Sequence, residues 1–230
     1  MMPEMISENP MYRLGIRLRW RRQMFWLMPA ASSTLVVLGA FTAWLLAESP
    51  ARGAVLVLGA LSLMLPLGVA AETAGGMLAE RRRGSIDSLL LTPLTNWEIL
   101  RGVFLACAVP PLFSVLLAAA VCALLAWRDL WSAAMVPALV FVGLSGCYYA
   151  GALGLLFGAR IRDLKYAAAP VAAACGMYAP LLALGLLAVA VWLATSSLGV
   201  AHAIACADVL LCLGFTPAVA IVALRSLRPS

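Results

Sequence analysis

The sequence predicts an all-α fold: a polytopic membrane helix bundle of six transmembrane helices, with the N-terminus and the C-terminus in the cytoplasm. Hydrophobic residues make up 64% of the 230 residues and charged residues only 11%, whereas a soluble domain carries about 25% charged residues. Long uncharged stretches recur, each with at least the roughly 20 residues that cross a bilayer as a helix. None of them alternates apolar and polar residues as the strands of a membrane β-barrel do.

The uncharged stretches also define the domain organisation. Residues 1–23 are expected to form a basic cytoplasmic pre-helix, and residues 24–230 a single membrane domain, because the outer connections are too short to fold on their own. The predicted spans cover residues 24–47, 53–79, 99–126, 131–159, 166–194 and 200–224.

The basic residues predict the orientation of this bundle. With the N-terminus inside, the inner segments hold fourteen of the sixteen Lys and Arg residues, and the outer segments hold only Arg52 and Arg128. Membrane proteins show this bias toward the cytoplasmic side of short loops. The net charge of +6 is therefore explained by topology and by attraction to anionic lipid headgroups, and nucleic acid is not an expected partner.

The pre-helix begins at Asn9-Pro10, which is a favourable N-cap and first-turn pair. Arg13, Arg17 and Arg21 then recur every four residues and so share one stripe of a helix. Such a stripe is expected to lie against the lipid headgroups of the cytoplasmic leaflet.

The segment 80–98, between the second and third spans, is charged and rich in turn signals. Arg81, Arg82 and Arg83 suit the last turn of a helix, and Gly84 follows at the position where helices commonly end. A short helix with leucines on one face is then expected until Pro93. Thr95 and Glu98 form the T-x-x-E pattern of a capping box at the start of the third span.

Small residues in the spans indicate close packing. In the fourth span Gly146, Ala150, Gly154 and Gly158 repeat every four residues, a spacing that lets membrane helices approach closely, and contact within the subunit is the favoured interpretation. The cysteines show no C-x-x-C pattern and all fall within predicted spans, so they are interpreted as packing residues; they are Cys107, Cys122, Cys147, Cys175, Cys206 and Cys212.

Two acids are candidates for functional polar groups within the membrane, because an ionisable side chain at that depth is costly. Glu72 lies two turns before the arginines of the second span, near its inner boundary. Asp208 is buried if the sixth span starts at Val200, and lies at the outer edge if the span starts at Val209. We favour the outer edge or a re-entrant turn, with Arg52 or Arg128 as the partner of this carboxylate.

The stretch 80–94 resembles the signature of ABC-2-type permeases, the membrane subunits of ATP-driven exporters. Members commonly read E-R/K-x-x-G-T/S-hydrophobic-E/D-x-L-L-L-T-P-L at this place. The residues that match position by position are Glu80, Arg81, Gly84, Ser85, Asp87, Leu89, Leu90, Leu91, Thr92, Pro93 and Leu94. The six predicted spans and the basic pre-helix also agree with the plan of the family.

This resemblance implies a transport subunit of a prokaryotic cytoplasmic (inner) membrane. In the family the loop between the second and third helices carries a coupling helix that docks on the ATPase, so residues 86–91, beginning with Ile86, would form it here. Arg81, Arg82 and Arg83 would then lie at the headgroups or meet acidic groups of the ATPase, and the pre-helix would touch the same subunit. No G-x-x-x-x-G-K-[ST] pattern occurs, so ATP and Mg²⁺ are expected on a separate ATPase chain.

The same resemblance implies a dimer, with a second copy or a homologous permease, and no cofactor in this chain. The compact length also resembles the haem-exporter permeases of cytochrome c maturation, and the two subfamilies are left open. Another alternative is a rhomboid-like intramembrane serine protease, suggested by G-L-S-G at 143–146 and by His202. The depth expected for Ser145 argues against such a protease. A non-transporting membrane scaffold is the remaining alternative.

Overall fold

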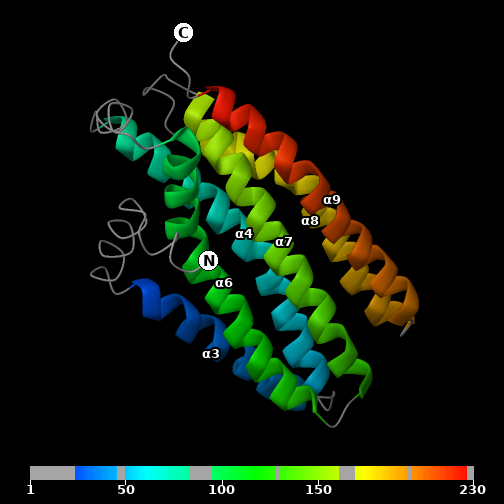
Figure 1. The fold of residues 1–230 in the computed structure, drawn as a ribbon. Helices are drawn as coiled ribbons and strands as arrows, with labels where there is room; N and C mark the ends of the chain where they lie inside the picture. The colour runs from blue at the N-terminus through cyan, green and yellow to red at the C-terminus, as the bar shows by residue number, and fades with distance from the viewer. Residues whose placement is uncertain are drawn as a thin grey trace, which may run out of the picture.

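The computed structural model describes residues 24–45, 50–82, 95–127, 130–160, 169–195 and 198–226. All of these residues except Thr95 and Trp127 are helical, so the predicted all-α architecture is confirmed for the described part of the chain. The helices are α3 (Met24–Leu45), α4 (Pro50–Arg82), α6 (Asn96–Ala126), α7 (Leu130–Arg160), α8 (Ala169–Thr195) and α9 (Leu198–Ser226) (Figure 1).

Five of the described helices are long and apolar enough to cross a membrane. Their membrane-length segments are Ala51–Leu78, Trp97–Ala126, Ala133–Arg160, Ala172–Trp192 and Gly199–Arg225. The described part of α3 adds a shorter apolar segment, Ser33–Thr42. The chain thus has the character of a multi-pass membrane protein. The count of six spans and the cytoplasmic placement of both termini remain predictions.

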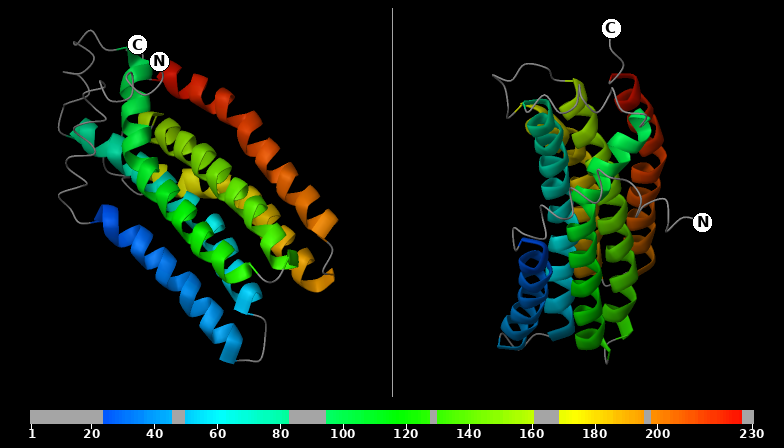
Figure 2. Two further views of the ribbon diagram at one scale, coloured as in Figure 1. Left: turned by 60° about the horizontal axis from the view of Figure 1, so that its bottom comes forward. Right: turned by 60° about the vertical axis from the view of Figure 1, so that its left-hand side comes forward.

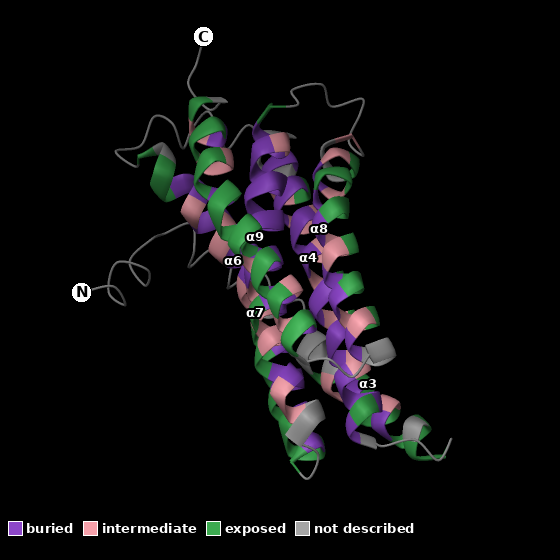
Figure 3. Ribbon diagram, turned by 90° about the vertical axis from the view of Figure 1, so that its right-hand side faces the viewer, coloured by how far each residue is buried: buried purple, intermediate pink, exposed green. Residues whose placement is uncertain are grey.

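The helices lie side by side in a bundle that has α4 and α7 at its centre (Figures 1 and 2). Helices α3 and α6 pack on one side of this central pair, and α8 and α9 pack on the other. In α7, 78% of the membrane-length segment is buried within the bundle, against 22% in α9. Figure 3 shows the same contrast, because the outer helices carry most of the exposed residues. Large apolar side chains such as Leu124, Phe141 and Leu210 face outward, as lipid-facing residues do.

Close contact between α4 and α7 depends on the glycines of α7. A Cβ atom built on Gly154 would collide with Thr73 Oγ1 and would lie 2.5 Å from the backbone oxygen of Ala70. A Cβ atom on Gly158 would lie 2.8 Å from the Cβ atom of Met77. The four-residue repeat of small side chains therefore packs within the subunit, as the sequence predicts.

Prolines are accommodated inside several of the described helices, for example at Pro66, Pro137, Pro180 and Pro217. Each proline removes one backbone donor, so the carbonyl four residues earlier loses its helical hydrogen bond. Packing against neighbouring helices makes such breaks tolerable in a membrane.

Replacing Gly154 by alanine is expected to weaken the contact between α4 and α7, because the added methyl group meets Thr73 and the backbone of α4. Overpacking of this kind costs about 1–3 kcal/mol, so Gly154→Ala should lower the midpoint of thermal unfolding of the purified protein in detergent. Gly75→Ala is the matched control, since nothing lies within 4 Å of a Cβ atom at that position of α4. Equal unfolding midpoints for the two variants would contradict the packing assigned to Gly154.

Candidate functional site: a lateral pocket between α6, α7 and α9

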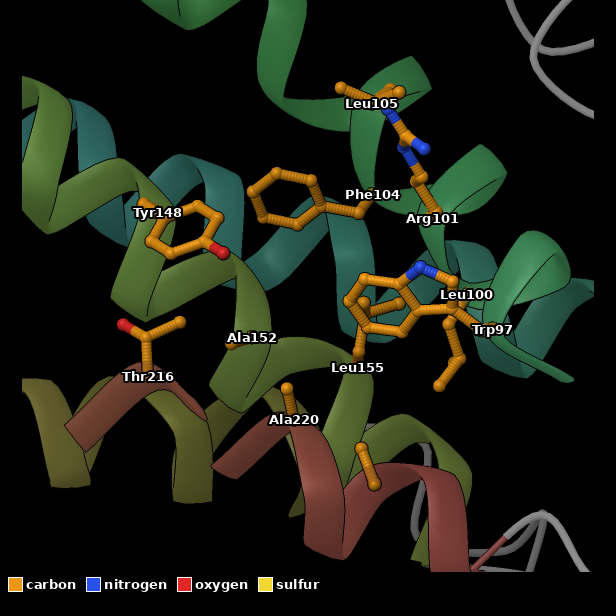
Figure 4. Close-up of a pocket in the computed structure, with 11 residues that line it drawn as sticks. Trp97, Leu100, Arg101, Phe104, Leu105, Tyr148, Ala152, Leu155, Thr216 and Ala220 are labelled. Carbon is orange, nitrogen blue, oxygen red and sulfur yellow. The ribbon is translucent and has the colours of Figure 1, made fainter. Parts of the chain in front are cut away.

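A pocket of about 150 Å³ opens between α6, α7 and α9 (Figure 4). Each helix contributes one face, because the lining residues of each recur at the three- and four-residue spacings of a helix surface. The lining residues are Trp97, Leu100, Arg101, Phe104 and Leu105 of α6, Tyr148, Ala152 and Leu155 of α7, and Thr216, Ala220 and Ala223 of α9.

The pocket exists because α6 and α9 both pack on α7 but hardly touch each other. Small side chains at Ala152 and Ala220 leave space between the helices, and aromatic side chains form a wall (Figure 4). The rings of Phe104 and Tyr148 contact edge to face, with their centroids 5.5 Å apart and their planes at 88°. This geometry is favourable for aromatic pairs and holds the wall of α6 against α7.

Most of the polar groups in the lining are engaged or lie at the edge. The Thr216 hydroxyl donates a hydrogen bond of 2.6 Å to the backbone oxygen of Cys212. Arg101 is half-buried, and its side chain runs along α6 toward Leu105 (Figure 4). Among the described residues no carboxylate forms an ion pair with this guanidinium. The pocket is therefore largely apolar, with a single cation at its rim.

The capping box at the start of α6 is confirmed, and it fixes the rim of the pocket. The Glu98 N–H donates to Thr95 Oγ1 at 3.3 Å, and the Thr95 N–H donates to Glu98 Oε2 at 2.7 Å. The two residues thereby satisfy backbone donors that the first turn leaves free. Trp97 and Arg101 lie within the first two turns after this cap, so the cap determines where both side chains enter the pocket.

The rest of the segment 80–98 falls largely outside the described residues. Glu80, Arg81 and Arg82 lie in the last turn of α4, which continues three residues beyond the predicted span. The residues that lie outside are Arg83, Gly84, Ser85, Ile86, Asp87, Leu89, Leu90, Leu91, Thr92, Pro93 and Leu94. Arg13, Arg17 and Arg21 of the pre-helix also lie outside. The coupling helix and the contact of the pre-helix remain predictions.

The two acids named from the sequence lie in different surroundings. Glu72 is half-buried in α4, and its backbone oxygen is 3.7 Å from Cys107 Sγ of α6, which is a weak S–H hydrogen bond. Asp208 is 1% exposed. Neither acid lines the pocket.

The favoured placement of Asp208 at the outer edge or in a re-entrant turn is wrong. Helix α9 runs without interruption from Leu198 to Ser226, so Asp208 lies about 15 Å inside the helix at 1.5 Å per residue. Among the described residues its Oδ1 atom has no hydrogen-bond donor. Arg52, one of the two predicted partners, is exposed at the start of α4, and Arg128 lies outside the described residues.

The neighbours of Asp208 are polar side chains of three helices. Tyr178 of α8 is 1% exposed and lies within electrostatic range of the Asp208 carboxyl group. Cys212, one turn further along α9, packs with Tyr178 in one buried cluster. The Tyr178 hydroxyl lies against α7 beside Ser145, because a Cβ atom built on Gly146 would be 2.7 Å from the hydroxyl oxygen. This buried polar cluster was missed from the sequence, because its members come from three separate helices.

Ser145 and His202 do not form a nucleophile and base pair. The Ser145 hydroxyl donates to the backbone oxygen of Phe141 at 2.8 Å, whereas His202 Nε2 lies 3.0 Å from the backbone oxygen of Ala134. Ala134 is eleven residues before Ser145 in α7, which corresponds to about 16 Å along the helix axis. The geometry therefore gives no support to a serine protease, in which the two side chains must hydrogen-bond.

The aromatic pocket was also missed from the sequence, although one signal was present. Trp97, Arg101 and Phe104 follow the capping box at spacings of four and three residues, which places them on one face of the helix. Which helix would face them depends on tertiary packing.

In comparisons with known proteins, no family description matches the chain and no curated protein matches it significantly.

Replacing Asp208 by asparagine is expected to stabilise the protein. A carboxylate at this depth carries the cost of desolvating a charge, about 2.5–3.5 kcal/mol at the centre of a membrane helix, and asparagine has nearly the same shape without the charge. Asp208→Asn should therefore raise the midpoint of thermal unfolding in detergent. Ser145→Ala is the control, because it removes a hydroxyl that is already bonded to its own helix and should change the midpoint little. A lower midpoint for Asp208→Asn would mean that the carboxyl group makes favourable contacts.

Proposed function

We propose that this chain is the membrane permease subunit of an ATP-driven ABC-2-type exporter in the cytoplasmic membrane of a prokaryote. The proposal includes six spans with both termini in the cytoplasm, α3 being the first span. The resemblance of residues 80–94 to the family signature and the positive-inside bias support it. The observation that carries it is the position of the segment 80–98, which joins the central helix α4 to the pocket helix α6.

This connection is well placed to transmit force. Helix α4 packs against α3, α6, α7 and α8, so a displacement of its inner end is felt by most of the bundle. Helix α6 begins at the Thr95–Glu98 capping box and carries Trp97 in its first turn. Force applied to the residues just before Thr95 therefore moves the capped first turn of α6 together with the α6 side of the pocket.

The mechanism we infer is alternating access driven by a partner subunit. The sequence contains no phosphate-binding loop, so a separate ABC ATPase binds ATP and Mg²⁺. The ATPase dimer closes when it binds ATP. Its movement acts on the leucines of the coupling segment and tilts α4 and α6. Because α6 and α9 hardly touch, the pocket between them can widen without breaking the contact of α4 with α7. A second copy or a homologous permease completes the translocation path by two-fold association.

Acidic substitutions in the coupling segment test this proposal. The chain carrying both Leu89→Asp and Leu90→Asp should insert normally but lose its complex with the ATPase, because charged side chains replace the apolar face that docks. The matched control is Leu227→Asp, which puts an acid beyond the end of α9 and should leave the complex intact. The measurements are co-purification of a P-loop ATPase from native membranes, identified by mass spectrometry, and the ATPase activity of the purified complex.

Two outcomes would contradict the exporter assignment. One is that no P-loop ATPase co-purifies with the unaltered chain. The other is that the doubly substituted chain retains the complex and its ATPase activity as fully as the chain with Leu227→Asp does.

A further inference from the structure

The pocket between α6, α7 and α9 is the strongest unassigned feature of the described structure, and we propose that it binds an acidic membrane phospholipid from the cytoplasmic leaflet. The phosphate of the lipid lies against Arg101, and part of one acyl chain fills the space beside Phe104 and Ala220. This inference rests on the membrane location and the predicted orientation. It does not need an ATPase, so the exporter assignment can fail without affecting it.

The depth of Arg101 matches the boundary between headgroups and hydrocarbon. Helix α6 has 31 residues and is about 46 Å long at 1.5 Å per residue, whereas the hydrocarbon core is about 30 Å thick. A centred helix therefore projects about 8 Å beyond the core at each end. Arg101 is five residues after Asn96, which is also about 8 Å along the axis. The backbone of Arg101 thus lies at the boundary between headgroups and hydrocarbon, and the rest of the pocket lies in the hydrocarbon.

The charge of the rim selects an anionic partner. No described carboxylate pairs with Arg101, although a guanidinium at the edge of the hydrocarbon needs a counter-ion or water. Arg160 at the end of α7 and Arg225 near the end of α9 are exposed at the same end of the bundle. The nearest described acid on α6 is Glu98, whose carboxylate is held by Thr95. Arginine also matches the oxygens of a phosphate well, because it offers several donors in one plane.

The shape of the pocket suits an acyl chain. Apart from Arg101 and Thr216, the lining consists of leucine, alanine and aromatic side chains (Figure 4). Trp97 is 48% exposed and Tyr148 is 45% exposed, so the pocket opens toward the surrounding lipid. Apolar cavities of about 150 Å³ hold ligands as large as benzene. The pocket therefore takes a short section of one chain, and the remainder of the lipid stays in the bilayer.

Quenching of Trp97 fluorescence by brominated lipids tests the inference on the full-length purified chain in nanodiscs. The signal of Trp97 is the difference between the unaltered chain and Trp97→Phe, since the chain holds seven tryptophans. Brominated phosphatidylglycerol should half-saturate this quenching at a mole fraction about fivefold lower than brominated phosphatidylcholine does, which is the ratio expected for one arginine near an anionic surface.

Four variants identify the groups responsible. Arg101→Gln should abolish the preference for phosphatidylglycerol, and Arg101→Lys should retain it. Ala220→Phe, which fills the pocket, should weaken quenching by both lipids. Arg225→Gln removes a cation at the same end but outside the pocket and should keep the preference. Helical circular dichroism and gel filtration establish that each variant is folded before it is compared.

The inference is overturned if the two lipids quench Trp97 equally in the unaltered chain, which would indicate ordinary bilayer contact. It is also overturned if Arg101→Gln keeps the preference, or if Arg225→Gln loses it as completely, because the charge of the whole surface would then be responsible. Concentration-dependent dimerisation that buries Trp97 and prevents quenching would identify a second copy as the occupant instead. If no P-loop ATPase co-purifies with the unaltered chain while the preference for phosphatidylglycerol is present, only the exporter assignment is contradicted.

Discussion

The close approach of α4 and α7 is the contact on which the rest of the bundle depends. Helices in lipid gain little from the hydrophobic effect, so their association relies on tight packing of small residues. Gly154 and Gly158 allow the backbone of α7 to reach that of α4, and α7 thereby becomes the most buried of the membrane-length helices. The remaining described helices are arranged around this pair, with α3 and α6 on one side and α8 and α9 on the other.

The same arrangement explains both candidate sites. Because α6 and α9 pack on α7 from different sides, the space between them is lined by α7 and remains open laterally. The polar cluster around Asp208 lies where α7, α8 and α9 meet. A protein that buries a carboxyl group at this depth accepts a loss of stability, and such losses concentrate at functional positions. The tight contact of α4 with α7 thus offsets the lower stability of the lateral pocket and of the buried Asp208.

The local features were predictable from the sequence, and the features that depend on packing were not. Hydropathy and charge located the helices to within a few residues, and the Thr95–Glu98 capping box follows from a pattern only four residues long. Asp208 was misplaced because the residues before it are weakly polar and do not mark the start of α9. The pocket was not foreseen because α6 and α9 are apolar on nearly all sides, so their sequences do not indicate which face turns toward α7.

The burial of Asp208 also has a consequence for how the chain is assembled during synthesis. An acid near the middle of a helix opposes insertion by about 2.5–3.5 kcal/mol, and α9 is the last described helix to be synthesised. By then α7 and α8, which surround this carboxyl group, are already in the membrane to receive it. Chain order therefore allows a hydrophilic group to enter the bilayer against protein instead of lipid, and a circular permutation that made α9 the first helix would remove that advantage.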